Sequence, residues 1–264
     1  MRRSNTSWQK VSHWYNKVTE HGQGHYYHQH IVIPGALKLL DLKNDSKLLD
    51  LACGNGVLAK AISKDADYVG IDIAPSLIKE AQRSDRNPKH KYLINDATKP
   101  LSVSNDFSHA AIILALQNIQ NPGRVFQNAA HHLKKDGVLV IVLNHPAFRI
   151  PRQSSWGIDE GRKIQYRRVD KYLSPMNIPI LTNPSDKNSR STMSYHFPIS
   201  YYSKILHDNG FAIDLIEEWT SDKESVGKSS KMENPGNAEI TLFMVLRAIN
   251  SNFLVFQDSF SYST

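Results

Sequence analysis

The chain has 264 residues, a net charge of +7 and a hydrophobic share of 40%. This length predicts one large domain, or one domain with a sizeable insertion, that folds without cross-links. The single cysteine excludes a disulfide framework and a cysteine-based zinc site. The apolar runs fall far short of the roughly 20 residues of a membrane span, and no apolar core follows the basic start. We therefore expect no membrane span, no secretory signal and a cytoplasmic location.

The positive charge raises the question of a nucleic-acid partner, because basic patches bind phosphates. Here the lysines and arginines are scattered over the whole chain, and no run of five like charges occurs. We therefore do not expect nucleic acid as a partner.

Short apolar runs alternate with helical stretches over most of the chain. In chain order the patterns predict a helix over 31–42, a strand over 47–51, a glycine-rich turn, a helix over 57–62, a strand over 68–73, a helix from Pro75, strands over 92–94 and 107–116, a helix over 125–133 closed by Asp136-Gly137, and a strand over 138–143. Such strands are apolar enough for burial on both faces. Their alternation with helices predicts a doubly wound parallel α/β sheet.

The pattern weakens over 145–196 and resumes with a helix over 201–209, a strand over 211–219, a polar loop over 221–237 and a last strand over 240–246. The chain therefore divides into an N-terminal cap segment (1–45), a ligand-binding core (46–144), a lid insertion (145–196), the remainder of the core sheet (197–250) and a tail (251–264).

The turn after the first strand is the candidate ligand site. Gly54 and Gly56 allow a tight turn and a close approach of the backbone to a ligand, and ligands of such sheets bind at the carboxyl ends of the strands. Asp50 suits a cationic amino-acid group better than a pyrophosphate. Asp72, at the end of the second strand, suits a ribose diol, and Asp96, after the third, suits an adenine edge. S-adenosylmethionine carries all these groups and no phosphate.

These segments resemble the motifs of the class I S-adenosylmethionine-dependent methyltransferases. Residues 48–56 look like the first motif, 70–77 like the second, 95–97 like the third, 115–119 like the fourth, and 133–139 like the segment that leads into strand five. The resemblance implies a Rossmann-like sheet of seven strands, mostly parallel with a C-terminal antiparallel strand, and S-adenosylmethionine as the cofactor. The implied cofactor contacts are Asp50, Ala52, Gly54, Gly56, Asp72, Ile73, Asp96, Ala97, Leu116 and Asn118.

Some of these residues have a purely structural alternative. Asp50 and Asp96 could be turn residues, Asp72 a helix cap and Asn118 an ordinary loop residue. Ala52 stands where the family has glycine.

Residues 14–15 and 24–34 are similar to a small-molecule branch of the family that includes quinone-biosynthesis enzymes. The fourth motif lacks the Asn/Asp-Pro-Pro-aromatic signature of amino-group methylation on adenine or glutamine. The resemblance therefore implies methyl transfer to a small-molecule acceptor by in-line displacement. The alternatives are an RNA or protein acceptor, a cofactor-binding protein without catalysis, and a nicotinamide-dependent oxidoreductase, because the glycine spacing also fits a dinucleotide site.

The chemistry requires little of the protein beyond alignment, because the cofactor carries the reactive group. A general base contributes only where the acceptor must lose a proton. His145 directly follows the strand over 138–143, at the ligand-bearing edge, and titrates near neutral pH, so it is the candidate catalytic base. Its alternative is a turn histidine before Pro146.

The insertion begins with aromatic residues and two guanidinium groups, at Arg149 and Arg152. Guanidinium forks match carboxylates, so we expect a lid that binds an acidic or phenolic acceptor, with Trp156, Tyr26 and His28 contributing. A solvated structural excursion is the alternative.

Histidines cluster in the N-terminal segment, at His21, His25, His28 and His30. We expect no metal there, because no cysteine and only Glu20 accompany them. An aromatic flap over the sulfonium is expected instead, with walls formed by Trp14, Tyr15, Tyr26 and Tyr27. His131 and His132 are expected on a solvated helix face.

Overall fold

Seven strands form one sheet, in the order β10-β11-β5-β4-β1-β2-β3, in the computed structural model, which describes residues 25–181 and 191–251. The strands are β1 (Lys47–Leu51), β2 (Asp67–Asp72), β3 (His90–Ile94), β4 (Phe107–Ile113), β5 (Leu133–Asn144), β10 (Phe211–Trp219) and β11 (Phe243–Asn250). β1 to β5 run parallel, and β11 is antiparallel to its neighbours β5 and β10. The predicted doubly wound, Rossmann-like sheet with a C-terminal antiparallel strand is confirmed.

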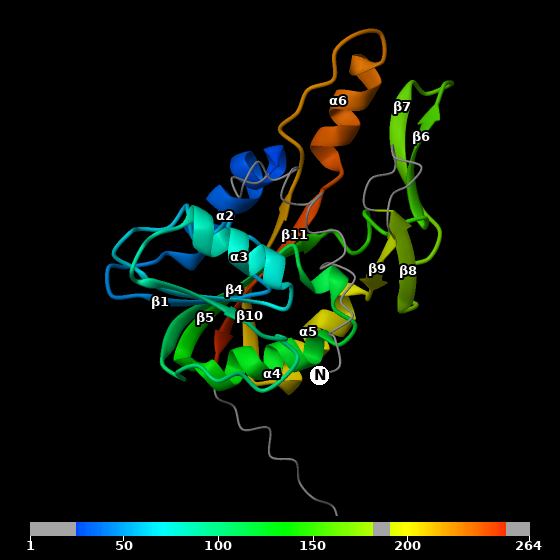
Figure 1. Cartoon of the computed structure of the whole chain (residues 1–264). Helices are drawn as coiled ribbons and strands as arrows, with labels where there is room; N and C mark the ends of the chain where they lie inside the picture. The colour runs from blue at the N-terminus through cyan, green and yellow to red at the C-terminus, as the bar shows by residue number, and fades with distance from the viewer. Residues whose placement is uncertain (1–24, 182–190, 252–264) are drawn as a thin grey trace, which may run out of the picture.

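Helices cover both faces of this sheet (Figure 1). α2 (Ile33–Leu40) and α3 (Pro75–Ser84) lie on one face, and α4 (Pro122–His132) and α5 (Ile199–Asp208) lie on the other. Successive strand residues point to opposite faces, so Leu48 packs towards α2 and α3 whereas Leu49 packs towards α4 and α5. Both side chains are fully buried, which explains why the strands are apolar without alternation.

A π-helical turn, η1 (His28–Val32), leads directly into α2. α2 lies close to the sheet because Gly35 has no side chain: a Cβ there would come within 2.4 Å of the Trp219 ring of β10. This packing fixes η1 beside the carboxyl ends of the strands, where His28 reaches the cavity described below.

Several element boundaries were predicted wrongly. The expected helix over 57–62 is a series of turns, in which the N–H of Ala61 donates to the carbonyl of Leu58. Gly56 holds a φ of +77°, outside the right-handed helical region, so a helix could begin only after it. β5 begins at Leu133, so α4 ends before Asp136-Gly137, and β11 begins at Phe243 rather than at 240.

His132 is buried rather than solvated. It lies on the inner face of α4, where its Nδ1 donates to the carbonyl of Ser104 at 2.9 Å. His131, one residue earlier, is exposed as expected.

The polar segment 221–237 contains most of a helix, α6 (Ser230–Glu239), where a loop was expected. The carbonyl of Ser229 accepts hydrogen bonds from the N–H groups of Met232 and Glu233. Gly236 packs against β7 (Ile164–Val169), since a Cβ at Gly236 would lie 3.1 Å from Oε1 of Gln165. This contact between distant segments, which the local pattern does not encode, supports the helix.

The insertion over 145–196 contributes two hairpins outside the main sheet (Figure 1). β6 (Ser154–Asp159) pairs with β7, and β8 (Met176–Leu181) pairs with β9 (Ser191–His196). None of the helices within 25–181 and 191–251 is long and apolar enough to cross a bilayer.

Candidate active site

A cavity of about 510 Å³ lies at the carboxyl ends of β1, β2, β3 and β4, the edge where parallel α/β sheets bind ligands. It is lined by eight of the predicted cofactor contacts: Asp50, Ala52, Gly54, Asp72, Ile73, Asp96, Ala97 and Asn118. It is also lined by residues that had not been predicted, among them Ile33, Asn95, Thr98, Met193 and Tyr195. Met193 and Tyr195 are two residues apart and therefore lie on the same face of a strand. This spacing is the sequence signal from which they could have been predicted together.

Asp50 lies at the end of β1 and is only 2% exposed. Its Oδ2 accepts a hydrogen bond from the Tyr68 hydroxyl at 2.7 Å, and its Oδ1 has no partner within the described residues. Burial raises the pKa of Asp50 to about 7, although the Tyr68 hydrogen bond acts in the opposite direction. A buried carboxylate oxygen without a partner is costly unless a ligand donates to it, so Asp50 fits an ammonium group in the cavity.

Tyr68 reaches Asp50 because Gly70, on the same face of β2, has no side chain. Gly70 is the cross-strand partner of Asp50. A Cβ on Gly70 would come within 2.8 Å of both the Tyr68 hydroxyl and the Sγ atom of Cys53. The Gly70 position therefore allows the hydrogen bond that leaves Oδ1 of Asp50 for a ligand.

Asp72 connects the glycine turn to the start of α3. Its Oδ2 accepts the N–H of Gly54 at 2.9 Å, and its Oδ1 accepts the N–H of Ala74 at 2.8 Å. Burial raises the pKa of Asp72, and these backbone hydrogen bonds oppose that shift. Each carboxylate oxygen has a second lone pair, so Asp72 can position the turn and still accept from a ribose hydroxyl.

The turn after β1 has left-handed backbone at Ala52 (φ +63°), Gly54 (+58°) and Gly56 (+77°). A non-glycine residue in this region costs roughly 1–2 kcal/mol, which is the physical basis of the family's preference for glycine where this chain has Ala52. Gly56 does not line the cavity. It is needed for packing, because a Cβ there would lie 3.0 Å from the Tyr92 hydroxyl.

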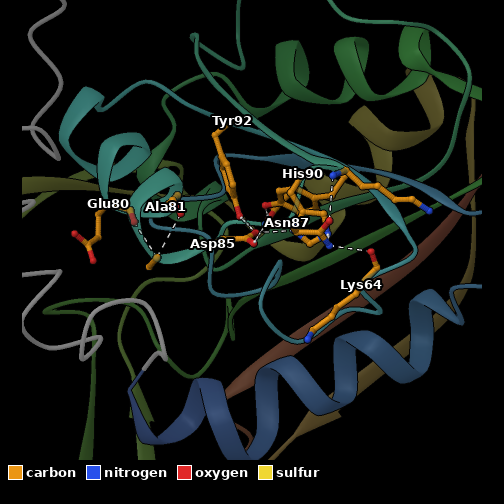
Figure 2. A network of polar contacts seen from close by, with 11 residues as sticks. Lys64, Glu80, Ala81, Asp85, Asn87, His90 and Tyr92 are labelled. Carbon is orange, nitrogen blue, oxygen red and sulfur yellow. Dashed lines mark hydrogen bonds and ion pairs between the residues drawn. The ribbon is translucent and has the colours of Figure 1, made fainter.

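Tyr92 is held against this turn by a polar network next to α3 (Figure 2). Its hydroxyl donates to Oδ2 of Asp85 at 2.5 Å, and Nδ1 of His90 donates to the same oxygen at 2.6 Å. The amide of Asn87 connects His90 to the carbonyl of Lys64. The network holds Tyr92 against the glycine turn, and none of its residues lines the cavity.

Asp96 forms a turn at the end of β3, as its structural alternative proposed, and also lines the cavity. Its Oδ1 accepts from both the N–H and the hydroxyl of Thr98, at 2.9 and 2.7 Å. Asn118 lines the cavity from the single turn η2 (Leu116–Asn118). Leu116 does not line the cavity, because it is fully buried in the core, so the structure does not place it beside the other predicted cofactor contacts.

His145 is not placed as a general base. It lies outside the cavity lining, and its Nε2 is 2.6 Å from Oε1 of Glu218. Its Nδ1 accepts the backbone N–H groups of Ala147 and Phe148 at 3.1 and 3.3 Å. Both ring nitrogens are therefore used to hold the turn after β5, and the structural alternative describes His145 better.

We expect His145→Ala to lower the free energy of unfolding by about 1–2 kcal/mol, because two part-buried N–H groups lose their acceptor. S-adenosylhomocysteine should bind the variant within about twofold of the parent, as measured by calorimetry alongside urea unfolding. The exposed His131→Ala is the control. A variant that binds normally but transfers no methyl group would restore His145 as the base.

Of the predicted acceptor contacts, only His28 lines the cavity. Tyr26 is exposed at the surface, where its hydroxyl donates to Asp222 and Lys223 lies over its ring. Trp156 packs under the guanidinium of Arg167. Arg149 and Arg152 are exposed residues after β5. The insertion over 145–196 instead reaches the cavity through β9, because that strand lies beside η2.

The predicted flap residues Trp14 and Tyr15, like His21, lie outside the described residues. Tyr27 packs on Phe243 and does not line the cavity. Within the described part of the chain, no three histidine, cysteine or acidic side chains are grouped as metal ligands would be.

The charge of the cavity lining favours a cationic ligand. Its carboxyl groups are those of Asp50, Asp72 and Asp96, and no lysine or arginine belongs to the described lining. Pyrophosphate would meet carboxylates without a compensating cation, whereas the ammonium and sulfonium groups of S-adenosylmethionine meet groups of opposite charge. The residues present therefore fit S-adenosylmethionine better than a dinucleotide.

Comparisons with known proteins agree with this chemistry. Residues 49–141 match a family model described as a methyltransferase domain. An uncharacterised methyltransferase of Schizosaccharomyces pombe is 34% identical over 222 residues, covering 70% of this chain and 84% of that protein. A demethylmenaquinone methyltransferase of Staphylococcus carnosus is 25% identical over 109 residues, 39% of this chain and 45% of that enzyme. An S-adenosylmethionine-dependent methyltransferase structure from Mesorhizobium loti has the same fold, with a TM-score of 0.64, 22% identity, and coverage of 82% and 96%.

Proposed function

This chain belongs to the class I S-adenosylmethionine-dependent methyltransferases, and we propose that it transfers the methyl group to a small organic acceptor. The observation that carries the proposal is the cavity itself, where an unpartnered oxygen of Asp50 meets a lining free of lysine and arginine among the described residues. Membership of this family sets aside the oxidoreductase alternative.

Residues at three strand ends would each bind a different group of the cofactor. Asp50 would hold the ammonium group through Oδ1, Asp72 the ribose hydroxyls, and Asp96 with Ala97 the adenine edge. S-adenosylmethionine supplies the activated methyl group. The chain supplies alignment, which is worth about 7–11 kcal/mol in well-oriented reactions.

A small acceptor is supported by the size of the cavity. Its volume, about 510 Å³, is within the usual range of small-molecule sites, and Met193 and Tyr195 of β9 line it. The partial similarity to an enzyme named demethylmenaquinone methyltransferase points in the same direction. A cytoplasmic location is part of this proposal.

A labelling experiment tests the proposal. We expect the purified protein to bind S-adenosylhomocysteine, to ignore NADH, and to transfer a radiolabelled methyl group to material in cell extract that resists both nuclease and protease. Label that disappears with nuclease or protease would establish an RNA or protein acceptor instead, with steep salt dependence expected for RNA. Binding without any labelled product would indicate a cofactor-binding protein without catalysis.

A further inference from the structure

His28 has an unsatisfied ring nitrogen at the cavity. It is 5% exposed, it lines the cavity from η1, and its Nδ1 has no hydrogen-bond partner within the described residues. Its ring packs edge-on against the ring of His25, with the centroids 4.1 Å apart, and the backbone N–H of His28 donates to the carbonyl of His25. A buried polar atom without a partner is unfavourable, so a ligand that donates a hydrogen bond to it binds more tightly.

The lining side chains that α2 and β9 contribute are apolar or uncharged. Ile33 follows His28 on the next helical turn, and Met193 and Tyr195 cover the cavity from β9. An anionic acceptor would find no lysine or arginine in the described lining and would face the carboxylates of Asp50, Asp72 and Asp96. The arginines that were expected to bind an acid, Arg149 and Arg152, do not line the cavity.

We propose that the methyl acceptor is an uncharged, ring-sized compound with a hydroxyl group, and that Nδ1 of His28 receives the hydrogen of this hydroxyl. The inference rests on the proposed function and adds the substrate class and one catalytic residue. Apolar walls with a few polar anchors are the usual composition of a site for such a molecule.

The protonation state of His28 suits this role. Burial, with a smaller effect of His25, lowers the pKa of His28 to about 3, so the imidazole is neutral at pH 7 and one ring nitrogen has a free lone pair. Such a weak base does not ionise the bound hydroxyl beforehand. It takes the proton when the hydroxyl oxygen has begun to bond to the methyl carbon and has become strongly acidic.

The step balances without another reactant. A lone pair of the hydroxyl oxygen forms the new C–O bond, the electron pair of the broken C–S bond stays on sulfur, and the O–H proton moves to Nδ1 of His28. The imidazolium is unstable in this buried position and returns the proton to water, which restores the neutral ring.

Two matched probes test the inference on full-length protein saturated with S-adenosylhomocysteine. We expect 2-naphthol to bind in calorimetry, and 2-naphthoate, which has the same rings and a negative charge, to bind at least 10-fold more weakly. With S-adenosylmethionine, 2-naphthol should become the methyl ether. Equal or tighter binding of 2-naphthoate, or no binding of 2-naphthol, would overturn the inference.

Variants separate binding from proton transfer. His28→Ala should weaken 2-naphthol binding at least 10-fold and leave S-adenosylhomocysteine affinity within threefold. His28→Gln keeps a hydrogen-bond acceptor, so it should recover 2-naphthol binding while kcat stays about 100-fold low or lower. The control is the exposed His30→Ala, which should match the parent. Unchanged 2-naphthol affinity in His28→Ala would exclude a contact between His28 and the acceptor. Failure of the parent protein to bind S-adenosylhomocysteine would instead overturn the proposed function.

Discussion

Replacing Asp50 with Asn is expected to weaken the binding of S-adenosylhomocysteine by about 2–4 kcal/mol, roughly 30- to 1,000-fold. The carboxylate is the group in the described lining whose oxygen has no partner, and its charge is buried at the end of β1. The amide keeps the shape and the Tyr68 contact but removes the charge that an ammonium group requires. Calorimetry with S-adenosylhomocysteine measures the loss.

The same binding should depend on pH in the parent protein. The pKa of Asp50 is about 7 before binding, so below that pH the carboxyl group must first lose a proton to receive a cation. Affinity should therefore fall about tenfold per pH unit below 7 and level off above 8. The slope should vanish in Asp50→Asn. The exposed Asp41→Asn is the control, and a flat pH profile in the parent would refute the role of Asp50.

Gly70→Ala should damage both stability and binding. The new Cβ would lie 2.8 Å from the Tyr68 hydroxyl and from Sγ of Cys53, inside a packed face of the sheet. Overpacking of this kind costs about 1–3 kcal/mol. If Tyr68 moves away, Asp50 loses its donor, and its pKa should rise further. We expect lower stability in urea unfolding and weaker S-adenosylhomocysteine binding at pH 7.

Gly123→Ala provides the matched control, because the nearest atom to its Cβ lies at 3.6 Å and the residue is in α4. Alanine favours a helix over glycine by up to about 1 kcal/mol, so this variant should be neutral or slightly more stable. A Gly70→Ala protein with parental stability and affinity would show that Tyr68 and Asp50 do not depend on the open space at Gly70.

Local patterns were sufficient for the sheet and for the three carboxylates that line the cavity. Asp50, Asp72 and Asp96 each follow a strand, and parallel strands bring their carboxyl ends to one edge, so strand order alone places the three carboxylates together. Leu116 shows where this reasoning fails. Two residues before Asn118, it shares the motif but points into the core, and the pattern carries no information on which side chain of a single turn faces the ligand.

The sequence by itself determined the fold, the glycine turn and the carboxylates around it, because apolar periodicity and left-handed turns act between near neighbours. The rest of the cavity lining was decided only by the tertiary structure. Glu218, 73 residues away, engages the ring of His145, and the folding of β9 brings Met193 and Tyr195 to the cavity. The packing of Gly35 on Trp219 places His28 at the same cavity. Each of these contacts joins segments that are distant along the chain, and no local pattern specifies which distant segment a side chain will meet.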